Sequence, residues 1–248
     1  MNALEIRSLR KAFGGLEAIS NLDLTVPYGQ RHALIGPNGA GKTTLFNLVT
    51  GWLTPTGGDI RIAGHPVASG RPDHIARTGL TRSFQKNMLL ESLSVLENLR
   101  IACQATHRAR RSLFRSKHAF GGVIAQAVSV AERMNLVDCL GREVRELSYG
   151  QKRQLEVAIA LCARPRILLM DEPAAGTSPS ERARLVALIN ALPRELTILL
   201  VEHDMDVVFA TCERITVLNY GKVLATGTRE DIQTNPAVID AYLGRRHA

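Results

Sequence analysis

The sequence GPNGAGKTT, at positions 36–44, has the residue types and the spacing of a phosphate-binding loop, G-x-x-x-x-G-K-[ST]. Its glycines allow the backbone to wrap closely around phosphate oxygens and to direct N–H groups inward. Lys42 would reach the β- and γ-phosphates of a nucleotide, and the Thr43 hydroxyl would ligate Mg²⁺. We therefore predict a phosphate site lined by Gly36, Pro37, Asn38, Gly39, Ala40, Gly41, Lys42, Thr43 and Thr44.

A pair of adjacent acids ends a short apolar run later in the chain. The run is ILLMDEP, at positions 167–173, and its acids are Asp171 and Glu172. Asp171 is suited to Mg²⁺, through a water molecule. Glu172 is placed to polarise an attacking water. Two acids at a strand end are common by themselves, so this hypothesis depends on the phosphate loop that precedes them.

A second candidate anion site begins at Ser148, in the sequence LSYGQKRQLEVA. Ser148 and Gln151 have the S-x-x-Q spacing of a capping box, with a helix-compatible run behind it. A helix N-terminus beside Gly150 is a good place to hold an anion, because its unpaired backbone N–H groups converge there.

The segments around the phosphate loop have strand and helix patterns. Residues 3–30 alternate apolar and polar side chains over short runs, as antiparallel strands do. A short apolar strand over 31–36 leads into the loop, and the helix after the loop should end at Gly51. We expect a further strand and turn over 57–67.

The later half of the chain changes character twice. From about Leu89 to Ala163 helical periodicity replaces the strand pattern. After Pro165 the apolar runs RILLM and LTILLV are typical of parallel strands buried on both faces, with SERARLVALINAL between them as a crossover helix. A hairpin should turn at Asn219–Gly221. The patterns predict an α/β core interrupted by a helical insertion.

Composition is that of an ordinary globular protein, with 248 residues of which 45% are hydrophobic and 22% charged. The apolar runs are too short to cross a bilayer and the first residues lack a secretory apolar region, so we expect a cytosolic location. The four cysteines lack zinc-site spacing. Much of the net charge of +8 lies in His107–Lys117, with five Arg/Lys and no acid. We interpret that segment as a solvated surface insertion.

Taken together, these motifs resemble the ATP-binding subunit of ABC transporters over essentially the whole chain. GPNGAGKTT is similar to its Walker A motif, ILLMDE to Walker B and LSYGQ to the signature. Gln85 in TRSFQ resembles the Q-loop and His203 in VEHDM the switch histidine. The resemblance implies an α/β P-loop NTPase core with an N-terminal antiparallel β-subdomain and an inserted α-helical subdomain. A single ABC ATPase domain would span 1–248, with 1–86 and 164–248 as the core and 87–163 as the helical signature subdomain.

The resemblance also implies a head-to-tail dimer with two ATP molecules between the subunits. Ser148, Gly150 and Gln151 would then bind the ATP of the partner subunit. The implied catalytic residues are Glu172, His203, Gln85 and Lys42, and the implied Mg²⁺ ligands are Thr43, Gln85 and Asp171. Phe13 in KAFGG resembles the aromatic residue that stacks on adenine, and the alternative is a core phenylalanine near a strand end.

Two positions depart from the family pattern. The signature has Tyr149 where the pattern has glycine, and we expect that this position needs no special backbone angle provided that Gly150 carries the close approach to phosphate. In PAAGTSP, Ser178 replaces the aspartate of many relatives, although serine can still donate and accept a hydrogen bond.

Finer resemblance, in LVTGWLTPTGGDI, EPAAG and the tail GTREDIQTNPAVIDAYLG, indicates the ATPase subunits of branched-chain amino acid importers. The implied partners are a second ABC ATPase subunit, identical or related, transmembrane permease subunits and, indirectly, a solute-binding protein. The implied location is peripheral, on the cytoplasmic side of the membrane. Segment 87–92 would dock a permease helix, and Arg108–Lys117 would face the membrane surface or the permease.

Two other functions are alternatives to a transport ATPase. A nucleic-acid-associated ABC ATPase is favoured slightly by the charge of +8, but the chain has one Walker set, no long coiled-coil insertion and no paired cysteines. No nucleic acid is therefore expected as a partner. A regulatory subunit without catalysis would need a broken Glu172 or His203, and both residues are present.

Overall fold

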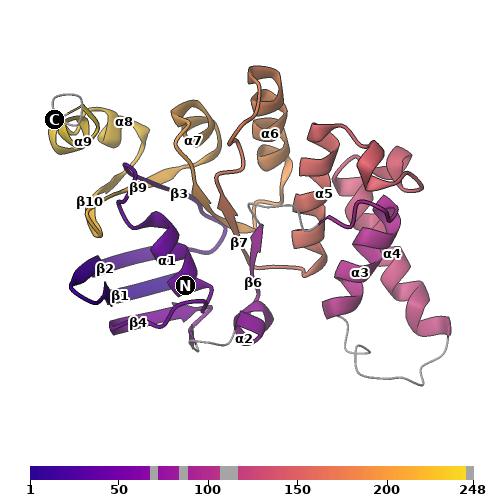
Figure 1. Ribbon diagram of the computed structural model, residues 1–248, viewed down its shortest axis with the longest axis horizontal. Coiled ribbons are helices and arrows are strands. Elements are labelled where there is room, and N and C mark those ends of the chain that lie inside the picture. The colour runs from indigo at the N-terminus through magenta and orange to yellow at the C-terminus, as the bar shows by residue number, and fades with distance from the viewer. Residues whose placement is uncertain (68–71, 84–88, 107–116, 244–248) are drawn as a thin grey trace. The chain divides into compact units, whose positions relative to one another are not determined.

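The computed structural model describes residues 1–67, 72–83, 89–106 and 117–243, which divide into two compact units (Figure 1). Unit 1 comprises Met1–Arg82, Arg166–Gly176 and Leu192–Ala248, and unit 2 comprises Ser83–Pro165 and Thr177–Ala191. The crossover helix, which the sequence division placed with the core, is grouped with unit 2. The division into 1–86 with 164–248 and 87–163 stays a prediction.

Unit 1 contains an antiparallel sheet with the strand order β2-β1-β4-β5, as the alternating N-terminal pattern predicts. Its strands are β1 (Asn2–Phe13), β2 (Leu16–Pro27), β4 (Gly57–Ile62) and β5 (His65–Pro66). Along β2, the side chains of Leu22, Leu24 and Val26 are buried and the residues between them are exposed. This buried face shares one apolar core with Leu45 and Phe46 of helix α1 (Lys42–Val49).

The second sheet of unit 1 has the strand order β10-β9-β3-β8-β7-β6. Its strands are β3 (Arg31–Ile35), β6 (Leu80–Ser83), β7 (Ile167–Asp171), β8 (Thr197–Val201), β9 (Arg214–Asn219) and β10 (Lys222–Gly227). Strands β3, β7, β8 and β9 run parallel. Every residue of β7 and β8 is buried, as their apolar runs predict. Every residue of β3 is buried too, including the polar Arg31 and His32. The carboxyl ends of these strands therefore meet at one edge, where ligands bind in such sheets.

The predicted turns lie where expected. Helix α1 ends at Val49, and Gly51 follows with a φ of 74°, as a glycine beyond a helix C-terminus does. The β9–β10 hairpin turns at Tyr220 and Gly221, whose φ values of 46° and 74° are those of a type I′ turn.

Short helices complete unit 1. They are α2 (Pro72–Arg77), α7 (Met205–Thr211), α8 (Arg229–Gln233) and α9 (Pro236–Leu243). Val208 of α7, Ile232 of α8 and Val238 of α9 pack in one cluster with β3 and β9.

Unit 2 is helical among its described residues, as the periodicity predicts. Its helices are α3 (Val95–Thr106), α4 (Lys117–Arg133), α5 (Tyr149–Cys162) and α6 (Pro179–Ala191), with 3₁₀ segments at Val137–Cys139 and Val144–Glu146. Leu155, Ala158 and Cys162 form the buried stripe of α5. The Gln126 amide of α4 donates to the Cys162 carbonyl at 2.8 Å.

Within the described ranges, none of the helices combines the length and the apolar character that crossing a membrane would require.

Candidate nucleotide-binding and hydrolysis site

The phosphate loop joins β3 to α1, and two of its glycines are required by close contacts. A Cβ atom on Gly36 would lie 2.2 Å from the Leu218 carbonyl oxygen, and one on Gly41 would lie 2.8 Å from the Ala18 carbonyl oxygen. Their φ values, 150° and 103°, are also unfavourable for other residues. Neighbouring backbone thus holds the loop tightly on both sides.

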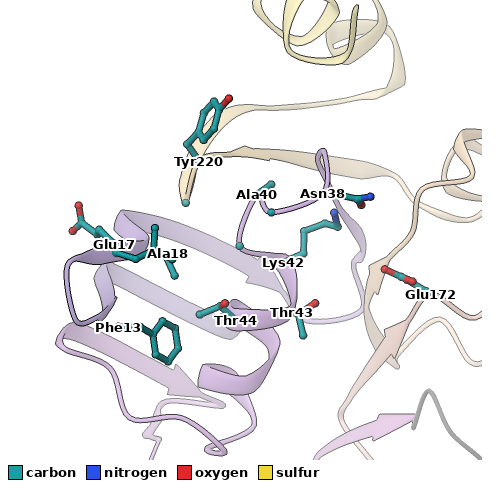
Figure 2. Close-up of a pocket in the computed structure, with 14 residues that line it drawn as sticks. Phe13, Glu17, Ala18, Asn38, Ala40, Lys42, Thr43, Thr44, Glu172 and Tyr220 are labelled. Carbon is teal, nitrogen blue, oxygen red and sulfur yellow. The ribbon is translucent and has the colours of Figure 1, made fainter. Parts of the chain in front are cut away.

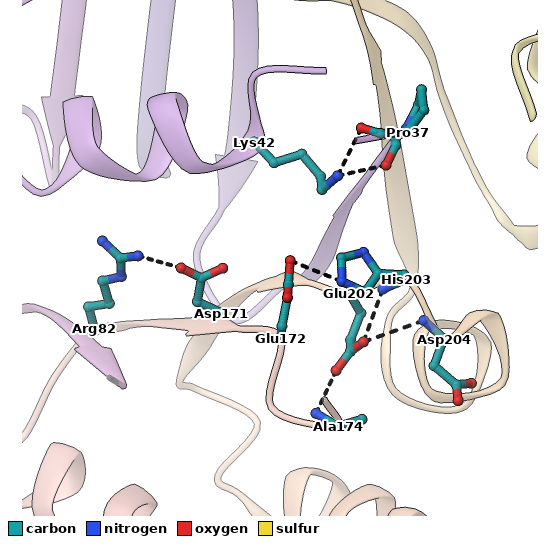
Figure 3. A network of polar contacts seen from close by, with 10 residues as sticks. Pro37, Lys42, Arg82, Asp171, Glu172, Ala174, Glu202, His203 and Asp204 are labelled. Atoms are coloured by element: carbon teal, nitrogen blue, oxygen red, sulfur yellow. Dashed lines mark hydrogen bonds and ion pairs between the residues drawn. The ribbon is translucent and has the colours of Figure 1, made fainter. Parts of the chain in front are cut away.

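The Lys42 side chain lies inside this loop and is 7% exposed. Its ammonium group donates to the carbonyl oxygens of Gly36, at 2.7 Å, and Pro37, at 3.1 Å (Figure 3). Burial lowers the pKa of Lys42, while the carboxylates of Glu172 and Asp171 act to raise it. Lys42 is the group that can meet phosphate oxygens arriving at the loop.

A pocket of about 400 Å³ lies over the loop (Figure 2). It is lined by Phe13, Leu16, Glu17, Ala18, Asn38, Gly39, Ala40, Gly41, Lys42, Thr43, Thr44, Glu172, Tyr220 and Gly221. Phe13, the predicted adenine-stacking residue, is the last residue of β1 and is 45% exposed. The Lys11 ammonium lies 4.8 Å from its ring centroid. The β9–β10 turn adds Tyr220, which sequence reasoning missed because only the fold brings that hairpin to the loop.

The two acids at the end of β7, Asp171 in the strand and Glu172 directly after it, have different environments. Asp171 is 4% exposed, and Glu172 follows it with a φ of 48°. A non-glycine residue in the left-handed region is strained, and such strain persists where surrounding bonds fix the backbone. Here the Glu172 N–H donates to the Val201 carbonyl at 2.8 Å, and the Glu172 carbonyl accepts from Ala175 at 3.0 Å. Figure 3 shows that the two carboxylates have different partners, Arg82 for Asp171 and His203 for Glu172.

Glu172 meets the predicted switch histidine. Its Oε1 atom lies 3.0 Å from Nε2 of His203, which follows the carboxyl end of the neighbouring strand β8. The Glu172 side chain is 25% exposed and that of His203 is 48% exposed, so water can reach the pair. A carboxylate beside an imidazole can orient water and accept its proton.

Arg82 is a partner of Asp171 that sequence reasoning missed. Its guanidinium forms an ion pair with Asp171 Oδ2 and donates to Asn47 Oδ1 at 2.9 Å. The same group lies 5.6 Å from the Phe46 ring centroid. One signal in the sequence could have indicated this contact. An aspartate at the end of a buried strand needs a partner of opposite charge, and the stretch TRSFQ supplies an arginine, Arg82.

Glu202 is a third residue of the site that the motifs did not reveal. It is 2% exposed, although it directly follows strand β8 at the carboxyl edge of the sheet. Its carboxylate accepts from the backbone N–H groups of Ala174, His203 and Asp204, at 2.7, 3.0 and 3.4 Å (Figure 3).

The predicted Mg²⁺ ligands can be tested against the chemistry of the ion. Magnesium takes oxygen donors and usually binds one or two carboxylates, with waters and substrate phosphates completing its shell. The exposed Thr43 hydroxyl and the Asp171 carboxylate are such donors. Among the described residues, no group of three or more His, Cys, Asp or Glu side chains is arranged so that it could hold a metal ion. Gln85, the third predicted ligand, lies outside the described residues.

The signature motif in unit 2 forms the predicted capping box. The Ser148 hydroxyl accepts from the Gln151 N–H at 3.3 Å, and Gln151 Oε1 accepts from the Ser148 N–H at 3.0 Å. The Gln151 side-chain amide also lies 3.0 Å from the Cys139 sulfur. Tyr149 is the first residue of α5, so the expectation that this position needs no special backbone angle is confirmed. A Cβ on Gly150 would meet no atom within 4 Å.

Ser178 caps helix α6. Its hydroxyl accepts from the Glu181 N–H at 3.4 Å, and its own N–H donates to the Glu181 carboxylate at 2.8 Å. The serine that departs from the family pattern therefore has a local role in starting a helix.

Comparison with known proteins agrees with this geometry. The family model described as ABC transporter matches residues 19–175, and the model described as branched-chain amino acid ATP-binding cassette transporter matches residues 222–248. The chain is 44% identical to the high-affinity branched-chain amino acid transport ATP-binding protein BraF of Pseudomonas aeruginosa, with 97% of each chain covered. It is 40% identical to LivG of Escherichia coli (strain K12), which carries the same description, also with 97% of each chain covered.

Solved structures also match. The ADP conformation of MJ1267, an ATP-binding cassette of an ABC transporter, has a TM-score of 0.84 and 27% identity, covering 98% of this chain and 99% of that chain. The predicted fold class, an α/β P-loop core with an antiparallel sheet, is confirmed by this likeness and by the two observed sheets. The chain therefore belongs to the ABC transporter family, within its branched-chain amino acid transport ATP-binding proteins.

Proposed function

We propose that this chain binds ATP and hydrolyses it to drive the import of branched-chain or related amino acids through a membrane permease. The observation that carries the proposal is the Glu172–His203 pair, joined at 3.0 Å, with Glu172 lining the pocket that holds Lys42. A buried cation on one wall and an acceptor for a water proton on another are what phosphoryl transfer to water requires.

Each residue has a distinct role in this reaction. Lys42 and the loop N–H groups neutralise and hold the phosphates, and Phe13 stacks on the adenine. Glu172 accepts the proton of the attacking water, which His203 helps to orient beside the γ-phosphate. A bound Mg²⁺ would be held by Thr43, Asp171 and Gln85 and would offset charge on the phosphate oxygens.

The second phosphate half-site is assigned to a partner subunit. Ser148 and Gly150, at the N-terminus of α5, would bind the γ-phosphate of ATP held by a second copy or a related ATPase. Gln151 would act through the capping box, because its side chain is already bonded to Ser148 and Cys139. ATP binding then favours the dimer, and hydrolysis reopens it.

The permease would hold the chain at the cytoplasmic face of the membrane, and a solute-binding protein would deliver the solute to that permease. The segment proposed for permease docking, 87–92, and the basic segment Arg108–Lys117 fall partly or largely outside the described residues. The relatives BraF and LivG are transport proteins, and no observation supports the nucleic-acid alternative.

The test is Glu172→Gln. We expect the variant to bind ATP and to dimerise with it, while turnover falls on the order of 10²- to 10³-fold because the proton acceptor is lost. Glu230→Gln, on the exposed surface of α8, is the matched control and should keep full turnover. Isolation with native membranes, followed by identification of co-purifying proteins, tests the permease. Undiminished hydrolysis by Glu172→Gln would refute the assigned role.

A further inference from the structure

We propose that Glu202 is a positioning residue that sets the Glu172–His203 pair for catalysis by fixing the backbone on both sides of it. The inference deepens the proposed ATP hydrolysis and rests on it. Glu202 is at the start of the loop after β8, and its carboxylate reaches the loop after β7. A single buried side chain therefore joins the two loops that carry the pair.

The contacts of Glu202 divide between the loops. Oε1 accepts from the Ala174 N–H at 2.7 Å, two residues beyond Glu172. Oε2 accepts from the His203 N–H at 3.0 Å and from the Asp204 N–H at 3.4 Å. Three backbone donors thus converge on a carboxylate that is 2% exposed.

A carboxylate satisfies this arrangement, and a side-chain amide does not. Both of its oxygens accept, whereas a glutamine amide accepts at one atom and donates at the other. In Glu202→Gln the amide nitrogen would therefore face either the Ala174 N–H or the N–H groups of His203 and Asp204. A buried N–H group that loses this acceptor destabilises the native backbone conformation around it. One of the two loops would therefore lose its hydrogen bond to residue 202.

The Glu172–His203 pair depends on a fixed backbone because packing around the two side chains holds them only weakly. Those of Glu172 and His203 are 25% and 48% exposed, so packing does not hold them firmly. The φ of 48° at Glu172 also needs a surrounding structure that enforces it. The hydrogen bonds of Glu202 provide this support. They fix the backbone of Ala174, two residues after Glu172, relative to the backbone of His203.

The experiment compares ATP hydrolysis by wild type, Glu202→Gln and Glu202→Asp. We expect Glu202→Gln to lower kcat about 100-fold, since small misplacements of catalytic groups cost this much, while the KM for ATP stays within about three-fold. The shorter carboxylate of Glu202→Asp should keep the adjacent His203 and Asp204 bonds and give an intermediate kcat. Val238→Ala, a change on the buried side of α9, controls for general loss of stability.

A double-mutant cycle separates positioning from a merely structural role. If Glu202 acts through His203, the combination of Glu202→Gln with His203→Ala should have the kcat of His203→Ala alone. Independent, multiplicative losses would overturn the proposal. Should Glu202→Gln fail to fold, the same cycle is measured with Glu202→Asp.

Two failures can be told apart. If wild type does not hydrolyse ATP, the proposed function is wrong. If wild type hydrolyses ATP but Glu202→Gln loses no more kcat than Val238→Ala does, the proposed function stands and the role of Glu202 is wrong.

Discussion

Nε2 of His203 lies 3.0 Å from Oε1 of Glu172. The two residues follow strands β8 and β7, which are parallel neighbours in the second sheet. Their side chains meet because the carboxyl ends of both strands lie at one edge. The distance allows the imidazole to orient the carboxylate, and each side chain is partly exposed to water.

Loss of this imidazole should affect turnover more than binding. In His203→Ala we expect kcat to fall on the order of 10²-fold, because Glu172 loses its partner, while ATP affinity changes far less. Steady-state hydrolysis and nucleotide binding, measured on the same preparation, check this expectation. Equal losses in kcat and in affinity would instead assign His203 mainly to ATP binding.

The ion pair between Arg82 and Asp171 should stabilise the fold. Their side chains are 15% and 1% exposed, so Arg82→Gln leaves a buried carboxylate without its charged partner. We expect the free energy of unfolding to fall by about 3 kcal/mol, measured by denaturant titration. The exposed pair Arg145–Glu143 provides the control, since Arg145→Gln should cost less than about 1 kcal/mol. A similar cost in both variants would contradict the prediction.

Stability should depend on pH through His32, which is 1% exposed. Its ring nitrogens lie 3.1 Å from Gln30 Oε1 and 2.7 Å from Thr216 Oγ1. Burial first, and the charge of Arg214 second, lower the pKa of His32 from 6.5 to about 4. The unfolded chain therefore binds the proton first as the pH falls, and the folded state follows only near pH 4.

The His32 contribution is thus fully present above pH 6.5 and is lost as the pH falls towards 4, by about 3 kcal/mol in total. Denaturant titrations across this range should show a shallower pH dependence for His32→Gln than for wild type. His65→Gln, at an exposed position, should leave the slope as it is in wild type. An unchanged slope in His32→Gln would refute the assignment.

Ser148 has a local role and a proposed intermolecular role, which Ser148→Ala separates. Loss of the cap should lower the free energy of unfolding of the monomer by about 1 kcal/mol. Loss of the phosphate contact should weaken ATP-driven dimerisation and hydrolysis. Thermal unfolding without nucleotide reports the first, and sedimentation with ATP in the Glu172→Gln background reports the second. If stability falls while dimerisation is unaffected, Ser148 is a cap only.

Local patterns were sufficient for much of the structure. The phosphate loop, the buried strands β3, β7 and β8, the turn at Gly221 and the capping box at Ser148 each depend on residues close together in sequence. Their cause is short-range: glycine tolerates positive φ, buried strands are mostly apolar, and a serine oxygen reaches the N–H three residues ahead. The sequence by itself therefore determined the local structure of the two proposed phosphate half-sites.

The tertiary structure alone decided which side chains share the site. Arg82 binds Asp171, Glu202 joins the loops of Glu172 and His203, and Tyr220 borders the pocket. These relationships follow from strand order, in which β6 lies beside β7, β8 lies between β7 and β3, and β9 lies beside β3. Strand order is a property of non-local pairing, and one sequence contains no short-range signal for it. Burial then selects the partners of Asp171 and Glu202. A charged group removed from water is stable only beside a group of opposite charge or a set of hydrogen-bond donors.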